Sequence, residues 1–179
     1  MSPLSSPRFG GFPRALGSRS STATDSDLSA SSSYASNKTV FGAILRNELP
    51  ATILYEDERV LCFRDIRPVS KHHSLVIPKR HIAHSGALTR DDRDLVQHME
   101  NVACNAVKVD FPNLNVEECR QTNELSLGFH RWPCLSVHHL HLHTIYPMPC
   151  QHWWYRVIHP REYSWWYRPS TDFTETKTK

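Results

Sequence analysis

The 179-residue sequence lacks the cysteine pattern of a disulfide-stabilised secreted protein. Its five cysteines are odd in number and widely spaced, and no two of them form a C-x-x-C pair. The N-terminal region also lacks the apolar core of a secretory signal peptide. Both absences predict a protein of a reducing compartment without a disulfide framework.

Long apolar runs and strong net charge are also absent. The longest stretch without Asp, Glu, Lys or Arg covers residues 132–155, and it carries five histidines and three prolines, which excludes a transmembrane helix there. The net charge of +3 and the mean hydropathy of −0.50 predict neither a membrane protein nor specific nucleic-acid binding. Hydrophobic residues make up 39% of the chain, which is enough for one globular core.

Residues 1–36 have too few large apolar side chains to offset chain entropy, and they contain twelve serines. We expect a disordered Ser-rich tail there. The first 24 residues contain Arg8, Arg14 and Arg19 and no acidic residue, as mitochondrial transit peptides do. Glycines and prolines interrupt any amphipathic helix in that segment, so we expect a cytoplasmic or nuclear protein, with a mitochondrial one as the alternative.

A globular pattern begins at residue 37, and we expect one domain over 37–150 followed by an aromatic extension and polar tail over 151–179. Asn37 is a candidate cap for the first helix, and Thr89 with Asp92 resembles a second helix start. A Trp-Trp-Tyr-Arg motif at 153–156 returns at 165–168, which indicates aromatic edges packed on a sheet or at a subunit contact. The expected elements are a helix over 40–45, strands over 52–55, 60–64 and 74–77, a helix from 89 to about 108, and strands over 124–129 and 136–146. This order predicts an α+β fold with a largely antiparallel sheet.

Histidine is the residue in excess, with twelve copies, five of them within residues 130–143. Apolar and polar residues alternate along 136–145, so a strand would place His139, His141 and His143 on one face and leucines on the other. Ordinary solvated faces mix Lys, Glu and Thr. Three imidazoles opposite a core-facing side therefore predict a functional site.

Two chemistries fit such a face. Same-face neighbours on a strand start about 6.6–6.8 Å apart, whereas nitrogens on one zinc ion lie within about 4 Å of each other. Three successive histidines of a regular strand therefore converge poorly on a metal, and a third ligand would have to be His73 or His130. Alternatively, a neutral imidazole can attack phosphorus while a protonated neighbour stabilises charge, and His141, in the middle, is best placed for attack.

Residues 139–145, His-Leu-His-Leu-His-Thr-Ile, resemble the H-φ-H-φ-H-φ-φ signature of the histidine triad (HIT) superfamily. The blocks at 40–50, 55–58, 63–68 and 73–82 resemble its Hint branch in order and spacing. The resemblance covers residues 40–149. It implies a five-stranded antiparallel sheet with two main helices, a homodimer, and no cofactor or metal.

The resemblance also implies an activity, namely hydrolysis of the P–N bond of adenosine 5′-phosphoramidates with release of AMP. His141 would attack the α-phosphorus to give a nucleotidyl-histidine, which water then cleaves. His139 and His143 would hold phosphate oxygens and orient His141, His73 would be a fourth histidine bonded to the triad, and Ser136 would lie near the leaving group.

The resemblance assigns roles to further residues, and some of these residues have a second interpretation. Asp65 would accept from the ribose hydroxyls or simply close a turn before Pro68. His130 would contact the leaving group or be an ordinary loop histidine. His138 has no catalytic part. The apolar slot for the base, whose members are equally core candidates, would consist of Val40, Phe41, Ile44, Leu49, Phe63 and Ile66. We expect surface positions for His72, His81, His84 and His98.

The chain departs from relatives in one informative place. Thr39 and Gly42 stand where some Hint proteins carry a C-x-x-C pair that contributes to a zinc site, which argues against structural zinc there. Two further functions remain open at this point. One is an AMP-binding regulatory or scaffold protein with incidental turnover, and the other is a metal-dependent enzyme.

Overall fold

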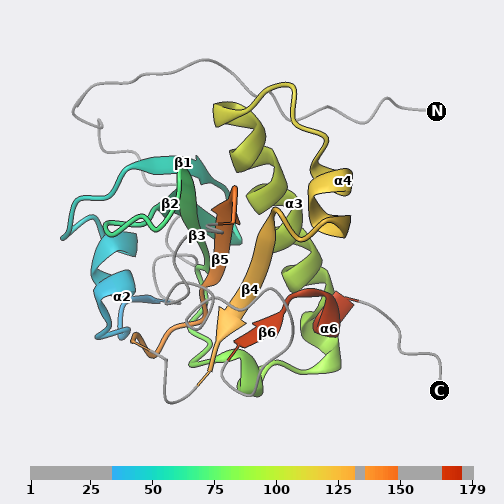
Figure 1. Cartoon of the computed structure of the whole chain (residues 1–179). Coiled ribbons are helices and arrows are strands. Elements are labelled where there is room, and N and C mark those ends of the chain that lie inside the picture. The colour runs from blue at the N-terminus through green and yellow to red at the C-terminus, as the bar shows by residue number, and fades with distance from the viewer. Residues whose placement is uncertain (1–33, 132–135, 149–166, 175–179) are drawn as a thin grey trace, which may run out of the picture.

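The computed structural model describes residues 34–131, 136–148 and 167–174. The predicted Ser-rich tail up to residue 33 and most of the aromatic C-terminal extension, including the first Trp-Trp-Tyr-Arg motif, lie outside these residues. The described elements are α2 (Val40–Leu45), β1 (Ile53–Glu56), β2 (Val60–Arg64), β3 (His72–Pro78), η1 (Ser85–Ala87), η2 (Arg90–Asp92), α3 (Arg93–Asp110), α4 (Val116–Gln121), β4 (Ser126–His130), β5 (Leu142–Tyr146), β6 (Tyr167–Pro169) and α6 (Thr171–Thr174) (Figure 1).

The strands form one antiparallel sheet in the order β1-β2-β3-β5-β4-β6, which confirms the predicted α+β class. The sheet has six strands and not five. The additional strand, β6, pairs with β4 through Gly128 and Pro169, and Phe173 beyond it lies edge-on against Phe129. A strand of three residues at a sheet edge is held by backbone hydrogen bonds, so it leaves no apolar period in the sequence.

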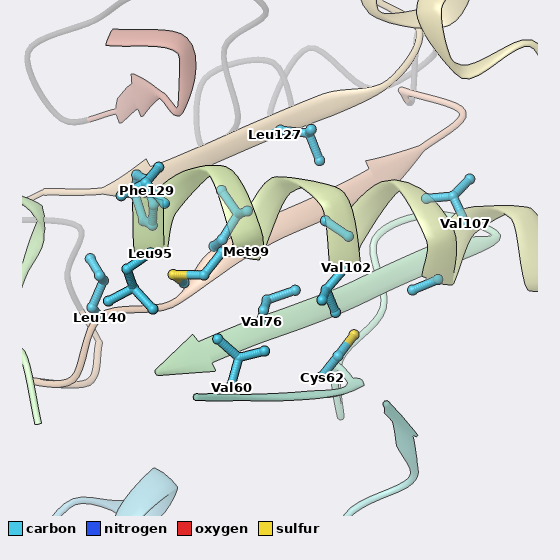
Figure 2. Packing of buried hydrophobic residues seen from close by; sticks show 14 of the residues in the cluster. Val60, Cys62, Val76, Leu95, Met99, Val102, Val107, Leu127, Phe129 and Leu140 are labelled. Carbon is cyan, nitrogen blue, oxygen red and sulfur yellow. The ribbon is translucent and has the colours of Figure 1, made fainter. Parts of the chain in front are cut away.

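Strand alternation divides the sheet into two differently covered faces. Val60, Cys62 and Val76 point to α3, where they meet Met99 and Val102 in the larger core cluster (Figure 2). The intervening residues of β2 and β3 point the other way and pack with Phe41 and Leu45 of α2; they are Leu61, Phe63, Leu75 and Ile77. Each fully buried aliphatic or aromatic side chain contributes about 1.5–3 kcal/mol. Both helices are therefore held by their apolar faces.

The helix boundaries follow the local sequence. The expected helix start at Thr89 is a capping box: the Asp92 carboxylate accepts from the Thr89 backbone N–H, and the Thr89 side chain accepts from the Asp92 N–H. Helix α3 then runs two residues beyond the predicted end and stops at Asp110, close to Pro112, which cannot continue it. Helix α4 was not predicted from the sequence; the Asn115 side chain caps it by accepting from the Glu118 backbone N–H. None of the described helices is both long enough and apolar enough to cross a bilayer.

The predicted histidine strand is correct only in its second half. Residues 142–146 form β5, whereas 136–141 lie outside the sheet. Pairing of β5 with β3 stops at Val76, two residues before Pro78, which has no N–H for a further ladder bond. The chain is instead tied to the segment after β3, since the Leu140 N–H donates to the Ile82 carbonyl at 2.6 Å.

Candidate active site

Neighbouring strands bring the first two histidines together. His73 on β3 pairs with Ile145, and His143 on β5 pairs with Leu75. Directly paired residues of antiparallel strands share a face, so both imidazoles lie on the side of the sheet that α2 covers. His73 Nε2 lies 3.0 Å from His143 Nδ1, and the residue expected as a fourth histidine is thus in contact with the triad.

The hydrogen-bond network fixes the protons on this pair. The Val69 N–H donates to His73 Nδ1 at 3.3 Å, so the proton of His73 is on Nε2 and is donated to His143 Nδ1. The proton of a neutral His143 is then on Nε2. Burial lowers the pKa of His73 below its ordinary value, which favours the neutral form of that ring.

His139 occupies the turn before β5 and makes two buried contacts. Its Nε2 donates to the Pro78 carbonyl at 2.8 Å, and its Nδ1 lies 2.6 Å from Nδ2 of Asn37. Burial lowers the pKa of His139 to about 4. The ring is consequently neutral at physiological pH and serves to fix the local backbone.

His141 has the properties of a nucleophile. Its Nδ1 donates to the His139 carbonyl at 2.7 Å, which leaves the lone pair on Nε2. Only 3% of the residue is exposed, and this burial lowers its pKa. A neutral imidazole whose proton is held on the far nitrogen can attack an electrophile without prior deprotonation.

His130 belongs to the same cluster. It is the last residue of β4, on the same face as His143, and the two ring centroids are 4.3 Å apart. Of the two interpretations left open by the sequence, the loop histidine is therefore wrong, because His130 is a buried strand residue within the histidine cluster.

Asp65 has the turn-closing role that was one of its two interpretations. Its Oδ1 accepts from the Arg67 N–H at 2.7 Å and so closes the turn before Pro68. Its Oδ2 lies 3.6 Å from His73 Nε2, at the border of the histidine cluster. Its expected contact with the ribose hydroxyls stays a prediction.

The residues expected to form the base slot differ in exposure, and their role in binding the base stays a prediction. The Phe41 ring lies 5.2 Å from that of His141 and 5.7 Å from that of Phe63, and Ile44 packs against the same cluster. Val40, Leu49 and Ile66 do not join it, with exposed fractions of 45%, 43% and 94%. Val40 lies on the outer side of α2, Leu49 follows the end of that helix, and Ile66 projects from the turn that Asp65 closes.

Two residues near the triad, Ser136 and His138, are exposed. Ser136 is exposed, and no contact given by residues 136–148 joins it to the histidines, so its expected place at the leaving group stays a prediction. His138 is exposed as well, and its carbonyl accepts from His81 Nε2 at 2.8 Å. His81 is on the surface, as predicted, but its ring lies 5.3 Å from His139.

One surface prediction is wrong. His72 is fully buried, because alternation along β3 turns it toward α3 when His73 faces the triad. There its Nδ1 bonds Asp110 at 2.7 Å and its Nε2 bonds Ser74 at 2.9 Å. His84 is exposed as predicted, and His98 is partly exposed beside Asp57.

The histidine cluster also meets a first requirement for a metal ion. His130, His141 and His143 each offer a ring nitrogen, and these atoms lie within 4.8 Å of one another. Zinc needs its nitrogen ligands within about 4 Å of each other, so a small side-chain shift would suffice. The expectation of poor convergence assumed a regular strand; here the chain leaves the sheet before β5, and β4 brings the His130 ring to those of His141 and His143. The donor set thus fits a transition metal at the place where the nucleophile lies.

Asn37 is the site residue that the sequence did not reveal. It was expected to cap α2, but Thr39 is the cap. Asn37 is buried and bonds His139, which is 102 positions away in the sequence. The only signal was a lone asparagine before a helix, and helix capping accounts for that pattern equally well.

Comparison with known proteins agrees with this geometry. Residues 38–153 match the family model described as "Scavenger mRNA decapping enzyme C-term binding". The chain therefore belongs to the histidine triad (HIT) family, which includes this type of domain. Within the family, "Adenosine 5'-monophosphoramidase HINT3" of Xenopus tropicalis is 34% identical over 122 residues, which cover 68% of this chain and 74% of the relative.

Two further relatives show the extent of the likeness. The protein of the same name from Danio rerio is 45% identical over 95 residues, and the match covers 53% of this chain and 55% of that relative, so the chain spans about half its length. A HIT family hydrolase from Legionella pneumophila Philadelphia 1 superposes with a TM-score of 0.53 at 31% identity, over 63% of this chain and 96% of that structure.

Proposed function

We propose that the chain is a nucleotide phosphoramidase, a hydrolase that cleaves the P–N bond of adenosine 5′-phosphoramidates. One observation carries the proposal: His141 donates its only proton to the His139 carbonyl, so that a buried Nε2 lone pair lies among the neighbouring imidazoles. The names of the HINT3 relatives support the nucleotide and the bond.

The reaction would proceed in two displacements. His141 Nε2 bonds to the α-phosphorus while the P–N bond breaks, and the amine leaves with a proton from a neighbouring imidazole. Water then attacks the nucleotidyl-histidine, a proton returns to the histidine cluster, and AMP is released with His141 regenerated. Two displacements replace one difficult direct hydrolysis.

The other residues would bind and orient the substrate. Phe41 and Phe63 offer apolar surface to the base, and Asp65 offers a carboxylate to the ribose. His143, whose Nδ1 accepts from His73, would donate its Nε2 proton to a phosphate oxygen. Aimed donors of this kind stabilise the charge that develops at phosphorus.

The test measures AMP release from an adenosine 5′-phosphoramidate by the wild type, by His141→Ala and by the matched control His84→Ala, each with and without EDTA. The proposal expects EDTA-resistant turnover that only His141→Ala abolishes. Loss of activity in EDTA would favour a metal-dependent enzyme, for which His130, His141 and His143 supply the ligands. A folded wild type that binds AMP without turnover would favour a regulatory or scaffold role.

We further propose a homodimer in the cytoplasm or nucleus, or alternatively in mitochondria. The resemblance to the Hint branch supports the dimer, and the cysteine pattern supports a reducing compartment. Light scattering on the purified chain and imaging of the full chain with a C-terminal tag test these two points. A monomer at micromolar concentration would contradict the first, and secretion would contradict the second.

A further inference from the structure

Asn37 is held in a single orientation immediately before α2. Its Oδ1 accepts from the Thr39 N–H at 3.0 Å and from the Thr39 hydroxyl at 2.8 Å. A backbone N–H can only donate, so the oxygen of the amide must face Thr39 and the NH₂ must face the opposite side. The side-chain amide therefore presents a hydrogen-bond donor to whatever lies there.

His139 is the group that meets this donor. Nδ2 of Asn37 lies 2.6 Å from His139 Nδ1, while His139 Nε2 lies 2.8 Å from the Pro78 carbonyl. A carbonyl can only accept and the amide NH₂ can only donate. The two partners together select the neutral His139 tautomer with its proton on Nε2.

The Asn37 backbone is fixed as well. Its carbonyl accepts from Arg46 Nη1 at 2.7 Å, and the same Arg46 nitrogen donates to the Tyr34 carbonyl. Gly42 lies so close that a β-carbon at this position would be 2.2 Å from the Asn37 carbonyl oxygen. The start of α2 is thus packed directly on Asn37, which leaves the side chain only 4% exposed.

His139 in turn holds the nucleophile, since its carbonyl accepts the Nδ1 proton of His141. We infer that Asn37 is a positioning residue: it holds His139 in one tautomer and one place, and through the His139 carbonyl it keeps the lone pair of His141 on Nε2. The inference rests on the proposed function for its effect on turnover, but its effect on His139 is independent of any reaction.

An aspartate in place of Asn37 would replace the donor that faces His139 Nδ1 with an acceptor. One carboxylate oxygen would still accept from Thr39, but the other would face the His139 Nδ1 lone pair without a proton to donate. The contact becomes favourable only when His139 takes a second proton. Asn37→Asp should therefore convert His139 into an imidazolium at a pH where the wild-type ring is neutral.

The first experiment follows the ¹⁵N and ¹³C ring signals of His139 against pH in wild type, Asn37→Asp and the control Asn101→Asp. Asn101 is exposed on α3 and receives the same change of charge. We expect the His139 titration to move to higher pH in Asn37→Asp only. An unchanged His139 titration in folded Asn37→Asp would overturn the inference.

The second experiment separates positioning from helix stability. Asn37→Ala removes the His139 contact, whereas Thr39→Ala removes the α2 cap and the hydroxyl bond to Asn37 Oδ1 but keeps the Thr39 N–H that turns the amide NH₂ toward His139. Both should lower the melting temperature, because each removes hydrogen bonds at the start of α2. Only Asn37→Ala should lower kcat, by about tenfold with a smaller change in KM, as expected for a misplaced nucleophile. Equal kcat values in the two variants would contradict the positioning role.

The two proposals fail in different ways. A wild type without turnover refutes the phosphoramidase, yet the His139 titration still tests Asn37. An active wild type whose kcat and His139 titration are unaffected by substitution of Asn37 refutes the positioning role and leaves the phosphoramidase intact.

Discussion

Two adjacent histidines on β3 have opposite surroundings. His73 faces the side of the sheet covered by α2 and bonds another histidine, His143, at 3.0 Å. His72 faces α3 and bonds a carboxylate and a hydroxyl, those of Asp110 and Ser74. Both rings are buried, and burial lowers the pKa of both. Their difference therefore lies in their partners.

On the α3 side the partners of His72 are groups of the fold itself. Burial opposes ionisation of Asp110, but hydrogen bonds from Arg64 and His72 outweigh it and lower the pKa of that carboxyl. Ser74, His72 and Asp110 even follow the order of a hydrolase triad, but Ser74 is fully buried and no substrate can reach it. The same three residue types thus form a structural contact.

On the α2 side His73 and His141 each bond another residue of the histidine cluster. His73 donates to His143, and His141 is held through its Nδ1 so that its Nε2 keeps a lone pair. A histidine whose two nitrogens both bond core groups stabilises the fold. A histidine held by one nitrogen offers the other for chemistry. Four predictions test this distinction.

The largest effect is expected from His141→Ala. Removal of the nucleophile should lower kcat by a factor of about 10³ or more, while the melting temperature changes by only a few degrees. AMP release and thermal unfolding measure the two quantities. Residual turnover above one tenth of wild type would show that the α2-side histidines are not the reacting groups.

His72→Ala should give the converse result. The substitution leaves the Asp110 carboxylate and the Ser74 hydroxyl without their buried partner, which should cost about 3 kcal/mol of unfolding free energy. The kcat of the folded fraction should stay within about twofold of wild type, because His72 does not contact the site. Urea unfolding measures the loss of stability, and kcat is calculated per folded molecule. Lost activity in a folded variant would contradict the distinction between the two faces.

Acid should destabilise the protein through histidines of both faces. The pKa values of His72, His73, His139 and His141 are all lowered by burial, that of His139 to about 4. Unfolded histidine titrates near 6.5, so below that pH the unfolded chain binds more protons and stability falls. The pKa shift of His139 alone would lower the free energy of unfolding by about 3 kcal/mol between pH 6.5 and about 4. The urea midpoint between pH 7.5 and 5 measures this, and a midpoint that rises on acidification would contradict it.

The smallest effect is expected from His98→Ala. His98 Nε2 lies 2.6 Å from Asp57, a contact as short as that of His72 with Asp110, but both side chains are about one quarter exposed. Solvent screens such a pair, so its loss should cost about 0.5 kcal/mol. A loss as large as that of His72→Ala would mean that contact distance, and not burial, sets the strength of these pairs.

The sequence predicts the parts of the fold that depend on local order. The β1–β2 hairpin and the start of α3 follow from apolar period and capping residues, and His141 follows from a seven-residue motif. The partner that His72 meets under α3, Asp110, is 38 positions away, and residues 136–141 leave the sheet where the facing strand ends at Pro78. Such contacts join distant segments and leave no trace in local periodicity.

The strand order has a consequence for how the protein forms during synthesis. Strand β4 is made before β5, yet its only neighbours in the described sheet are β5 and β6, both of which follow it in the chain. When β4 leaves the ribosome, the β1-β2-β3 meander can already pair, but β4 has no strand to join. The segment that bridges the two parts is β5, which carries His143 and directly follows His141. Closure of the sheet and assembly of the histidine cluster are therefore one event, late in folding and dependent on contacts of long sequence separation.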